Sequence, residues 1–240
     1  MTTNSHSASF WNENNRRIPL WRRLFFRTPK STKGLATPNC IHQRCSGISL
    51  GNHAVKSILF STDIALIDHS DADAVLAVYP FPPSAKIMKT LIDFTDKAVI
   101  CGIGGGLTQG STALDMAQQA EQLGAVAVIV NQPFPNKDIE KIKRTIGIPI
   151  ISSISIGDFD FRRRIDAGVD LFHITGGQET CRIIQHINHH YPDYPIIATG
   201  GKTLGNIHEV IDVGAQAIVL TPPSNGTLFK SIMQQYRQGS

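Results

Sequence analysis

The stretch AVICGIGGGLTQGSTALDMAQQAEQLGAVAVIVNQ (residues 98–132) contains one complete strand–helix–strand unit. It begins with the apolar run AVICGIG (98–104) and ends with a second apolar run, AVAVIVNQ (125–132). The segment between the two runs opens on Ser111 and closes on Gly124, a polar cap and a terminal glycine that are typical of a helix. Because both runs are almost continuously apolar and do not alternate, they predict parallel strands that are covered on both faces.

The same pattern recurs on both sides of this unit. Each short apolar run is followed by a turn rich in Gly, Pro, Ser or Thr, and then by an amphipathic segment that suits a helix. The eight predicted strands are residues 56–61, 74–81, 98–104, 125–132, 148–156, 169–176, 194–200 and 216–221. Since eight parallel strands close into a barrel, the sequence predicts an α/β fold, a single (β/α)8 TIM barrel. A doubly wound open sheet is the alternative, although such sheets usually have fewer strands.

The ends of two helices are also predicted. The segment NKDIEKIKRTIG starts at Asn136, with its acidic residues early and its basic residues late, which complements the helix dipole. The segment TDIALIDHSD predicts a short helix in the first unit, and Asp63 suits the start of that helix as well as it suits a functional role.

Charge divides the chain into a basic N-terminal extension (residues 1–55) and the barrel (residues 56–240). Residues 1–45 carry eight basic side chains and one acidic side chain, a net charge of +7, whereas the remaining residues carry 15 basic and 18 acidic side chains, a net charge of −3. The barrel therefore offers no basic surface for nucleic acid. The extension has three interpretations: a segment packed on the barrel base or at a subunit contact, an arm for a membrane surface or an acidic partner, or a targeting peptide.

Other features of the composition indicate a soluble protein. No run approaches the ~20 apolar residues that cross a bilayer, and no secretory signal is visible at the N-terminus. The four cysteines are scattered, which fits a reducing, cytoplasmic location. The segment CIHQRC holds three potential metal ligands, but no second cluster supports a zinc site, so no metal is predicted. A homodimer is expected from the fold type alone.

In a barrel of this type the active site lies at the C-terminal ends of the strands. The polar residues predicted there, which would line a substrate site, are Asn131, Ser153, Ser155, Thr175, Gly176 and Gly177, together with His173. His173 is the only histidine predicted inside a strand, and it shares strand parity with Thr175, so both side chains are expected to face the pore. His173 suits a general acid or base, and it suits equally a histidine that is hydrogen-bonded within the barrel without a catalytic duty.

The segments ATGGKT and LTPPSNGT end the seventh and eighth predicted strands. Because TIM-barrel enzymes commonly bind phosphate with the loops that follow these strands, Gly200, Gly201 and Ser224 are predicted to hold an anion, and Lys202 adds positive charge. A plain tight turn at the glycine pair is the alternative. The adjacent prolines after strand 8 remove two N–H donors and weaken the phosphate prediction.

The sequence lacks the residues that dinucleotide binding, paired-carboxylate catalysis and Schiff-base catalysis would require at the strand ends. The glycines of GIGGGLTQG fail the dinucleotide spacing at Leu107, so a nicotinamide cofactor is not predicted, and no other cofactor is. Three glycines there suit instead a loop that makes room for substrate or moves. No strand end carries a pair of carboxylates. Lys202 lies just beyond a strand and is an anion ligand first and a Schiff-base candidate second.

The final two units, YPIIATGGKTLGNIHEVIDVGAQAIVLTPPS (194–224), resemble those of the ribulose-phosphate-binding and aldolase-type TIM barrels. The segment at 99–135 is similar in pattern to the dihydrodipicolinate synthase and N-acetylneuraminate lyase barrels. The catalytic lysine of those enzymes belongs on strand 6, where this chain has LFHITGG, so that role does not carry over. The run RRIDAGVDLFHITGG (163–177) looks most like barrel proteins described only as aldolase-type or hydrolase-type. The resemblance implies the fold and not the reaction.

Together these features predict a small-molecule enzyme that binds a phosphorylated or carboxylated metabolite at the C-terminal mouth of the barrel. The predicted chemistry is lyase or aldolase-like, or that of an isomerase, with His173 and Lys202 as the candidate catalytic residues and an anionic small molecule as the partner. Two alternatives stay open. One is a hydrolase, and the other is a non-catalytic metabolite-sensing barrel whose basic arm contacts an acidic partner.

Overall fold

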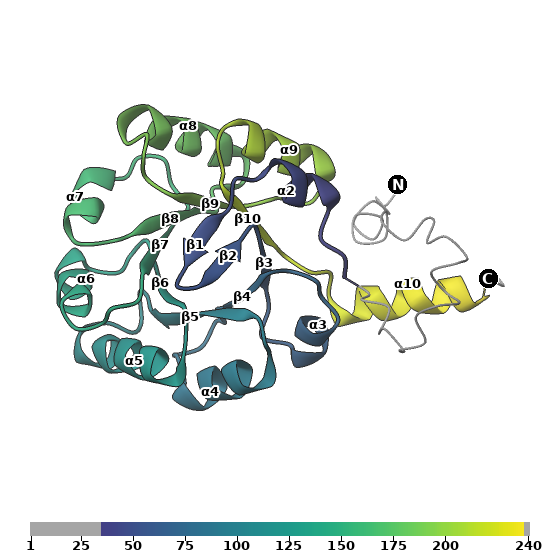
Figure 1. Cartoon of the computed structure of the whole chain (residues 1–240), viewed down its shortest axis with the longest axis horizontal. Helices are drawn as coiled ribbons and strands as arrows, with labels where there is room; N and C mark the ends of the chain where they lie inside the picture. Colours follow the sequence, from purple (N-terminus) through teal and green to yellow (C-terminus); the bar gives the residue numbers. More distant parts are fainter. Residues whose placement is uncertain (1–34, 238–240) are drawn as a thin grey trace.

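The computed structural model describes residues 35–237. Eight parallel strands close into a barrel in chain order, and the last of them pairs with the first (Figure 1). The barrel strands are β3 (Ser57–Phe60), β4 (Ala74–Ala77), β5 (Ala98–Gly104), β6 (Ala127–Asn131), β7 (Ile150–Ile154), β8 (Leu171–Ile174), β9 (Ile196–Thr199) and β10 (Ala217–Leu220). The predicted TIM barrel is confirmed, and the alternative prediction of an open doubly wound sheet is wrong.

Each strand falls within its predicted range, and most are shorter than predicted. The largest difference at a single strand end is at β4, which ends at Ala77, whereas the apolar run continues to residue 81. Prolines at 80, 82 and 83 follow this strand, and they cannot donate the backbone hydrogen bonds that a longer strand needs. The residues beyond Ala77 therefore leave the sheet as a loop at the barrel mouth.

Helices follow the strands and cover the outside of the barrel. They are α3 (Ile64–Asp68), α4 (Ala85–Phe94), α5 (Gly110–Leu123), α6 (Asn136–Lys143), α7 (Phe161–Asp166), the 3₁₀ turn η2 (Gly177–Glu179), α8 (Thr180–His190), α9 (Leu204–Asp212) and α10 (Asn225–Arg237), and α2 (Asn39–Arg44) precedes the barrel. In Figure 1 the last helix, α10, extends away from the barrel, in contrast to α4–α9.

The predicted helix ends are confirmed, except for the start of α5. Helix α5 begins at Gly110, one residue before the predicted start, and its N-cap is Gln109, so the prediction of Ser111 as the polar cap is wrong. It ends at Leu123, and Gly124 is its C-cap as predicted, with a φ of 99° that suits glycine. Helix α6 begins at Asn136 as predicted. Asp63 is the cap of α3: its carboxylate accepts hydrogen bonds from the backbone N–H groups of Ala65 and Leu66.

Two apolar layers hold the fold together, one inside the barrel and one between the barrel and its helices. The inner layer includes a β-hairpin that the sequence analysis did not predict, formed by β1 (Ile48–Leu50) and β2 (His53–Val55). Its buried side chains Ile48, Leu50 and Val55 pack with inward-facing residues of the barrel strands. In Figure 1 the hairpin lies across the centre of the barrel, and it forms the barrel floor.

The hairpin and α2 belong to the predicted N-terminal extension, of which residues 1–34 lie outside the described part of the chain. The CIHQRC segment folds as α2, which packs against α9. Burial raises the pKa of the Cys45 thiol to about 11. Within residues 35–237 there is no group of three or more His, Cys, Asp or Glu side chains that could hold a metal ion. In the same range, no helix has the length and apolar character to cross a membrane.

Candidate active site

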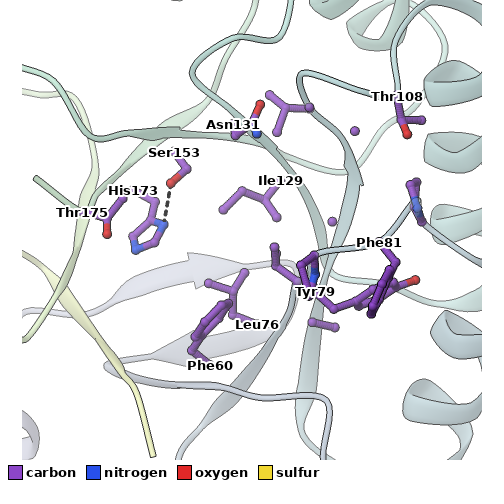
Figure 2. Close-up of a pocket in the computed structure, with 18 of the residues that line it drawn as sticks. Phe60, Leu76, Tyr79, Phe81, Thr108, Ile129, Asn131, Ser153, His173 and Thr175 are labelled. Atoms are coloured by element: carbon purple, nitrogen blue, oxygen red, sulfur yellow. Dashed lines mark hydrogen bonds between the residues drawn. The ribbon is translucent and has the colours of Figure 1, made fainter.

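A cavity of about 400 Å³ opens at the end of the barrel where the strands finish (Figure 2). Its floor is the apolar interior of the barrel, and its rim is made of the loops that follow β4 and β5. The side chains and glycines that line it are Phe60, Leu76, Ala77, Val78, Tyr79, Pro80, Phe81, Pro82, Pro83, Gly102, Gly104, Gly105, Gly106, Leu107, Thr108, Ile129, Val130, Asn131, Ser153, His173, Thr175, Thr199, Val219 and Thr221.

The cavity has an apolar side and a polar side, which come from different strands. On the apolar side lie Phe60 and Leu76 from β3 and β4, with Tyr79 and Phe81 from the loop after β4 (Figure 2). On the polar side, one inward position near the end of each strand from β6 to β9, and one just after β10, holds an amide, a hydroxyl or an imidazole. These positions are Asn131, Ser153, His173, Thr199 and Thr221. The cavity therefore suits a molecule with a hydrocarbon part and an oxygen-rich part.

Strand register brings the polar side chains together. Asn131 on β6 pairs with Ser153 on β7, and Ser153 pairs with His173 on β8. Side chains at paired positions of neighbouring strands leave the sheet on the same face, so these three groups lie side by side. The register explains how residues 22 and 20 positions apart in the chain form one polar surface.

His173 is held by two hydroxyl groups. Its Nδ1 lies 3.1 Å from Ser153 Oγ (Figure 2). Its Nε2 lies 3.0 Å from Thr199 Oγ1. The side chain is buried, and this burial lowers the pKa of His173 to about 4 because the charged imidazolium would lose its hydration. At neutral pH the imidazole is uncharged, and it has one nitrogen that accepts and one that donates.

None of the residues that line the cavity is an aspartate, glutamate, lysine or arginine. The polar side is therefore built of neutral donors and acceptors. A hard divalent cation such as Mg²⁺ is normally held by carboxylates, and a Schiff base needs a lysine. This lining fits neither of these chemistries.

The glycine-rich loop after β5 makes room for a neighbouring side chain. A Cβ atom at Gly105 would lie 2.6 Å from Asn131 Nδ2, and one at Gly104 would lie 2.6 Å from the carbonyl oxygen of Thr108. The Gly105 N–H donates to that same Thr108 carbonyl. The absence of side chains at these glycines lets the loop pack against Asn131 at the cavity rim.

Four of the predicted substrate-site or catalytic residues line the cavity, namely Asn131, Ser153, His173 and Thr175. The others lie outside its lining. The backbone N–H and hydroxyl of Ser155 both donate to Gln132 Oε1. Gly176 allows close packing of Ile183, and Gly177 has a φ of 60° at the start of η2.

The predicted anion ligands are also outside the cavity lining. The Gly200 N–H donates to the Val219 carbonyl of the neighbouring strand, and a Cβ at this position would lie 2.7 Å from Ile218 Cγ2. Gly201, with a φ of 72°, packs against Asn206. Ser224 Oγ accepts from the Thr227 N–H at the start of α10, and Lys202 is exposed. The structure gives the two glycines roles in turning and packing the chain.

Sequence analysis did not select Thr199 and Thr221 as site residues, although their positions carried a usable signal. Each lies two residues after a buried inward-facing residue, Ile197 and Val219 respectively, so each shares the parity that faces the barrel interior. The apolar wall from Phe60 to Phe81 was also missed. Apolar residues at strand ends resemble core residues in a sequence, and only the closed barrel shows that they surround a cavity.

The closed parallel barrel defines a TIM-barrel protein, with a partly polar cavity at its C-terminal mouth. No protein-family model matches the sequence, and no curated protein matches it. Solved structures match its fold.

Three solved structures illustrate the match. Phosphonopyruvate hydrolase in complex with oxalate and Mg²⁺ shares 12% identity over 79% of this chain and 84% of its own, with a TM-score of 0.58. Phosphoenolpyruvate phosphomutase from Streptomyces platensis subsp. rosaceus shares 15% identity over 77% and 81% of the two chains, with a TM-score of 0.56. The 4-hydroxy-tetrahydrodipicolinate synthase from Methylacidiphilum fumariolicum SolV shares 13% identity over 77% and 74%, with a TM-score of 0.57. At these identities the likeness shows the fold alone, which confirms the predicted resemblance to the aldolase-type barrels.

Proposed function

We propose that this protein is a small-molecule enzyme that transfers a proton in a lyase or isomerase reaction on a carboxylated metabolite, with His173 as the acid–base group. One observation carries the proposal. An uncharged imidazole lies between two hydroxyls, at the centre of the polar side of a cavity that has no charged side chain of its own. The substrate would therefore bring the charge that the cavity lacks.

A bound carboxylate would prepare His173 for proton transfer. In the free protein, burial keeps the pKa of His173 at about 4, which makes the imidazole a weak base. A negative charge placed beside the ring favours the imidazolium and raises the pKa of His173 towards neutrality. A base whose pKa lies near the working pH is the most effective one, so substrate binding and base activation would be coupled.

The two sides of the cavity indicate the shape of the substrate. The hydroxyls of Thr175, Thr199 and Thr221 and the amide of Asn131 would hold a carboxylate or a carbonyl oxygen. The wall formed by Phe60, Leu76, Tyr79 and Phe81 would cover a hydrocarbon part. A phosphate dianion would carry up to twice the charge into a site that has no lysine or arginine to balance it, so we favour the carboxylate.

Hydrogen–deuterium exchange by NMR tests this function. We expect the purified protein to exchange the C–H protons next to the carbonyl group in at least one member of a panel of 2-oxo acids with apolar chains. The His173→Gln variant is expected to lose about 10²–10⁴-fold of that rate, and the His42→Gln variant, which changes an exposed histidine on α2, is expected to keep it. Exchange that persists in His173→Gln would remove His173 from the acid–base role.

One contact favours a second candidate function, that of a hydrolase. Ser153 Oγ lies 3.1 Å from His173 Nδ1, within reach for the imidazole to accept the hydroxyl proton as Ser153 attacks a carbonyl carbon. In this case Ser153→Ala should abolish hydrolysis of p-nitrophenyl esters and the initial burst of p-nitrophenol. Under the proton-transfer proposal the same variant should retain exchange of the 2-oxo acid, with only a loss of the hydrogen bond that orients His173. The two functions are therefore separated by one variant and two assays.

A further inference from the structure

A second cavity lies outside the barrel mouth, between the start of α6 and helix α7. Its volume is about 360 Å³, and it is lined by Phe134, Pro135, Asn136, Lys137, Arg163 and Arg164. None of these residues lines the first cavity. Three of the six are cationic, and no residue of the lining is acidic.

Arg164 is a buried cation without a countercharge. Only 3% of the residue is exposed, and its two terminal nitrogens donate to the backbone carbonyls of Phe134 and Gln132, at 2.9 and 2.7 Å. The guanidinium also stacks on the ring of Phe159. No carboxylate within residues 35–237 forms an ion pair with Arg164, and its buried Nε has no hydrogen-bond partner. This burial lowers the pKa of Arg164 to about 10, as expected for a charge that nothing nearby balances.

The start of α6 adds further donors to the same cavity. Helix α6 begins at Asn136, and its cap residue Pro135 supplies no side-chain hydrogen bond. The N–H groups of Asp138 and Ile139 donate to the Pro135 carbonyl, which leaves those of Asn136 and Lys137 as donors at the helix start. The exposed side chains of Lys137 and Arg163 add two positive charges, neither of which has an ion-pair partner in the described part of the chain. The Asn136 side chain is not counted among these donors, because its Nδ2 donates to the Arg163 carbonyl and its Oδ1 is an acceptor.

The nearest carboxylates already have other partners. Asp138, in the first turn of α6, accepts a hydrogen bond from the Gly110 N–H at the start of α5, on the other side of the helix from α7. Asp160 caps α7 by accepting from the Arg163 N–H. In the described part of the chain, neither carboxylate forms an ion pair with Lys137, Arg163 or Arg164.

We infer that this second cavity binds a small oxyanion, such as a phosphate group, between Lys137, Arg163 and the start of α6, with buried Arg164 behind it. The inference does not depend on the function proposed for the first cavity. The oxyanion can come from two sources, free phosphate or the phosphate group of a metabolite, and the chemistry of recognition is the same for both.

Binding at this position would reach the first cavity through one loop. Arg164 holds the carbonyls of Gln132 and Phe134, in the loop that directly follows Asn131 at the cavity rim. The side chain of Gln132 in turn accepts hydrogen bonds from the backbone N–H groups of Ser155 and Ile156. An oxyanion that fixes the side chains around this loop would also fix the position of Asn131.

Isothermal titration with inorganic phosphate and with glycerol 3-phosphate, at constant ionic strength, tests the inference on the full-length protein. The double variant Lys137→Gln/Arg163→Gln removes two exposed charges and leaves Arg164 in place, so it is expected to fold. We expect it to weaken phosphate binding about tenfold or more. The control Lys86→Gln removes an exposed charge on α4 and is expected to leave the affinity unchanged.

The inference is overturned if neither compound binds, if the double variant binds phosphate as the natural protein does, or if Lys86→Gln weakens the binding as much as the double variant does. Equal affinity for the two compounds would show that the site recognises the phosphate group alone, so that free phosphate is a sufficient ligand. Tighter binding of glycerol 3-phosphate that His173→Gln weakens would assign the oxyanion to a longer ligand that reaches the first cavity. In both of these cases the double variant must still reduce the affinity.

Discussion

Replacing Leu50 with aspartate is expected to prevent the barrel from folding. Leu50 is fully buried in the hairpin that forms the barrel floor, where it packs with inward-facing residues of the barrel strands. Loss of a buried leucine costs about 2–5 kcal/mol, and an unpaired buried carboxylate adds a penalty of several kcal/mol. Because the whole fold of a domain is stabilised by only about 5–15 kcal/mol, the sum approaches or exceeds the free energy of unfolding.

The hairpin provides its own control for this prediction. His53 pairs with Leu50 across the two strands, but its side chain is exposed. The His53→Asp variant should therefore keep a urea midpoint close to that of the natural protein, and Leu50→Ala should lie between the two. The measurement is urea unfolding followed by circular dichroism. A Leu50→Asp protein with an unchanged midpoint would mean that the hairpin does not close the barrel floor in solution.

Stability is expected to fall in acid because of His173. Burial lowers the pKa of His173 to about 4 in the native state, whereas an unfolded histidine titrates near its ordinary value of 6.5. Above pH 6.5 both states are neutral and His173 has no effect on stability. As the pH falls from 6.5 towards 4 the unfolded state binds a proton that the native state excludes, so the native state loses up to about 3 kcal/mol.

The His173→Asn variant isolates this contribution. The variant has its own stability at neutral pH, but all other titrating groups are shared with the natural protein. The difference in free energy of unfolding between the two proteins should therefore change by about 3 kcal/mol between pH 7 and pH 4. Urea titrations at several pH values in this range give the difference. Parallel stability curves for the two proteins would show that His173 can be protonated in the folded state without cost.

The cavity at the barrel mouth lacks the charged side chains that two common chemistries of enzymes require. No carboxylate lines the cavity at the barrel mouth, and no lysine lies on the sixth barrel strand, β8. The residues at the mouth therefore do not fit a carboxylate-held Mg²⁺ site or a Schiff base. The reaction has to be inferred from the neutral groups that are present.

The sequence alone determined the fold, because the evidence for it is local. Apolar runs of strand length, glycines such as Gly124 and polar starts such as Asn136 recur through the chain, and each depends on residues close in sequence. Counting the units then predicted the closed barrel. The sequence also placed Asn131, Ser153, His173 and Thr175 at strand ends, because alternation along a strand fixes which side chains share a face.

Only the tertiary structure decided what those residues contact. Ser153 and His173 meet because of the register between β7 and β8, and Thr199 reaches the imidazole from a third strand. In the sequence, the hairpin at Leu50 falls within the predicted N-terminal extension. In the structure, its apolar side chains pack against the interior of the barrel. Arg164 on α7 is buried against the backbone carbonyls of Gln132 and Phe134, about 30 residues earlier in the chain. Each of these contacts joins residues distant in sequence, and their energies depend on burial and register, which exist only once the barrel has closed.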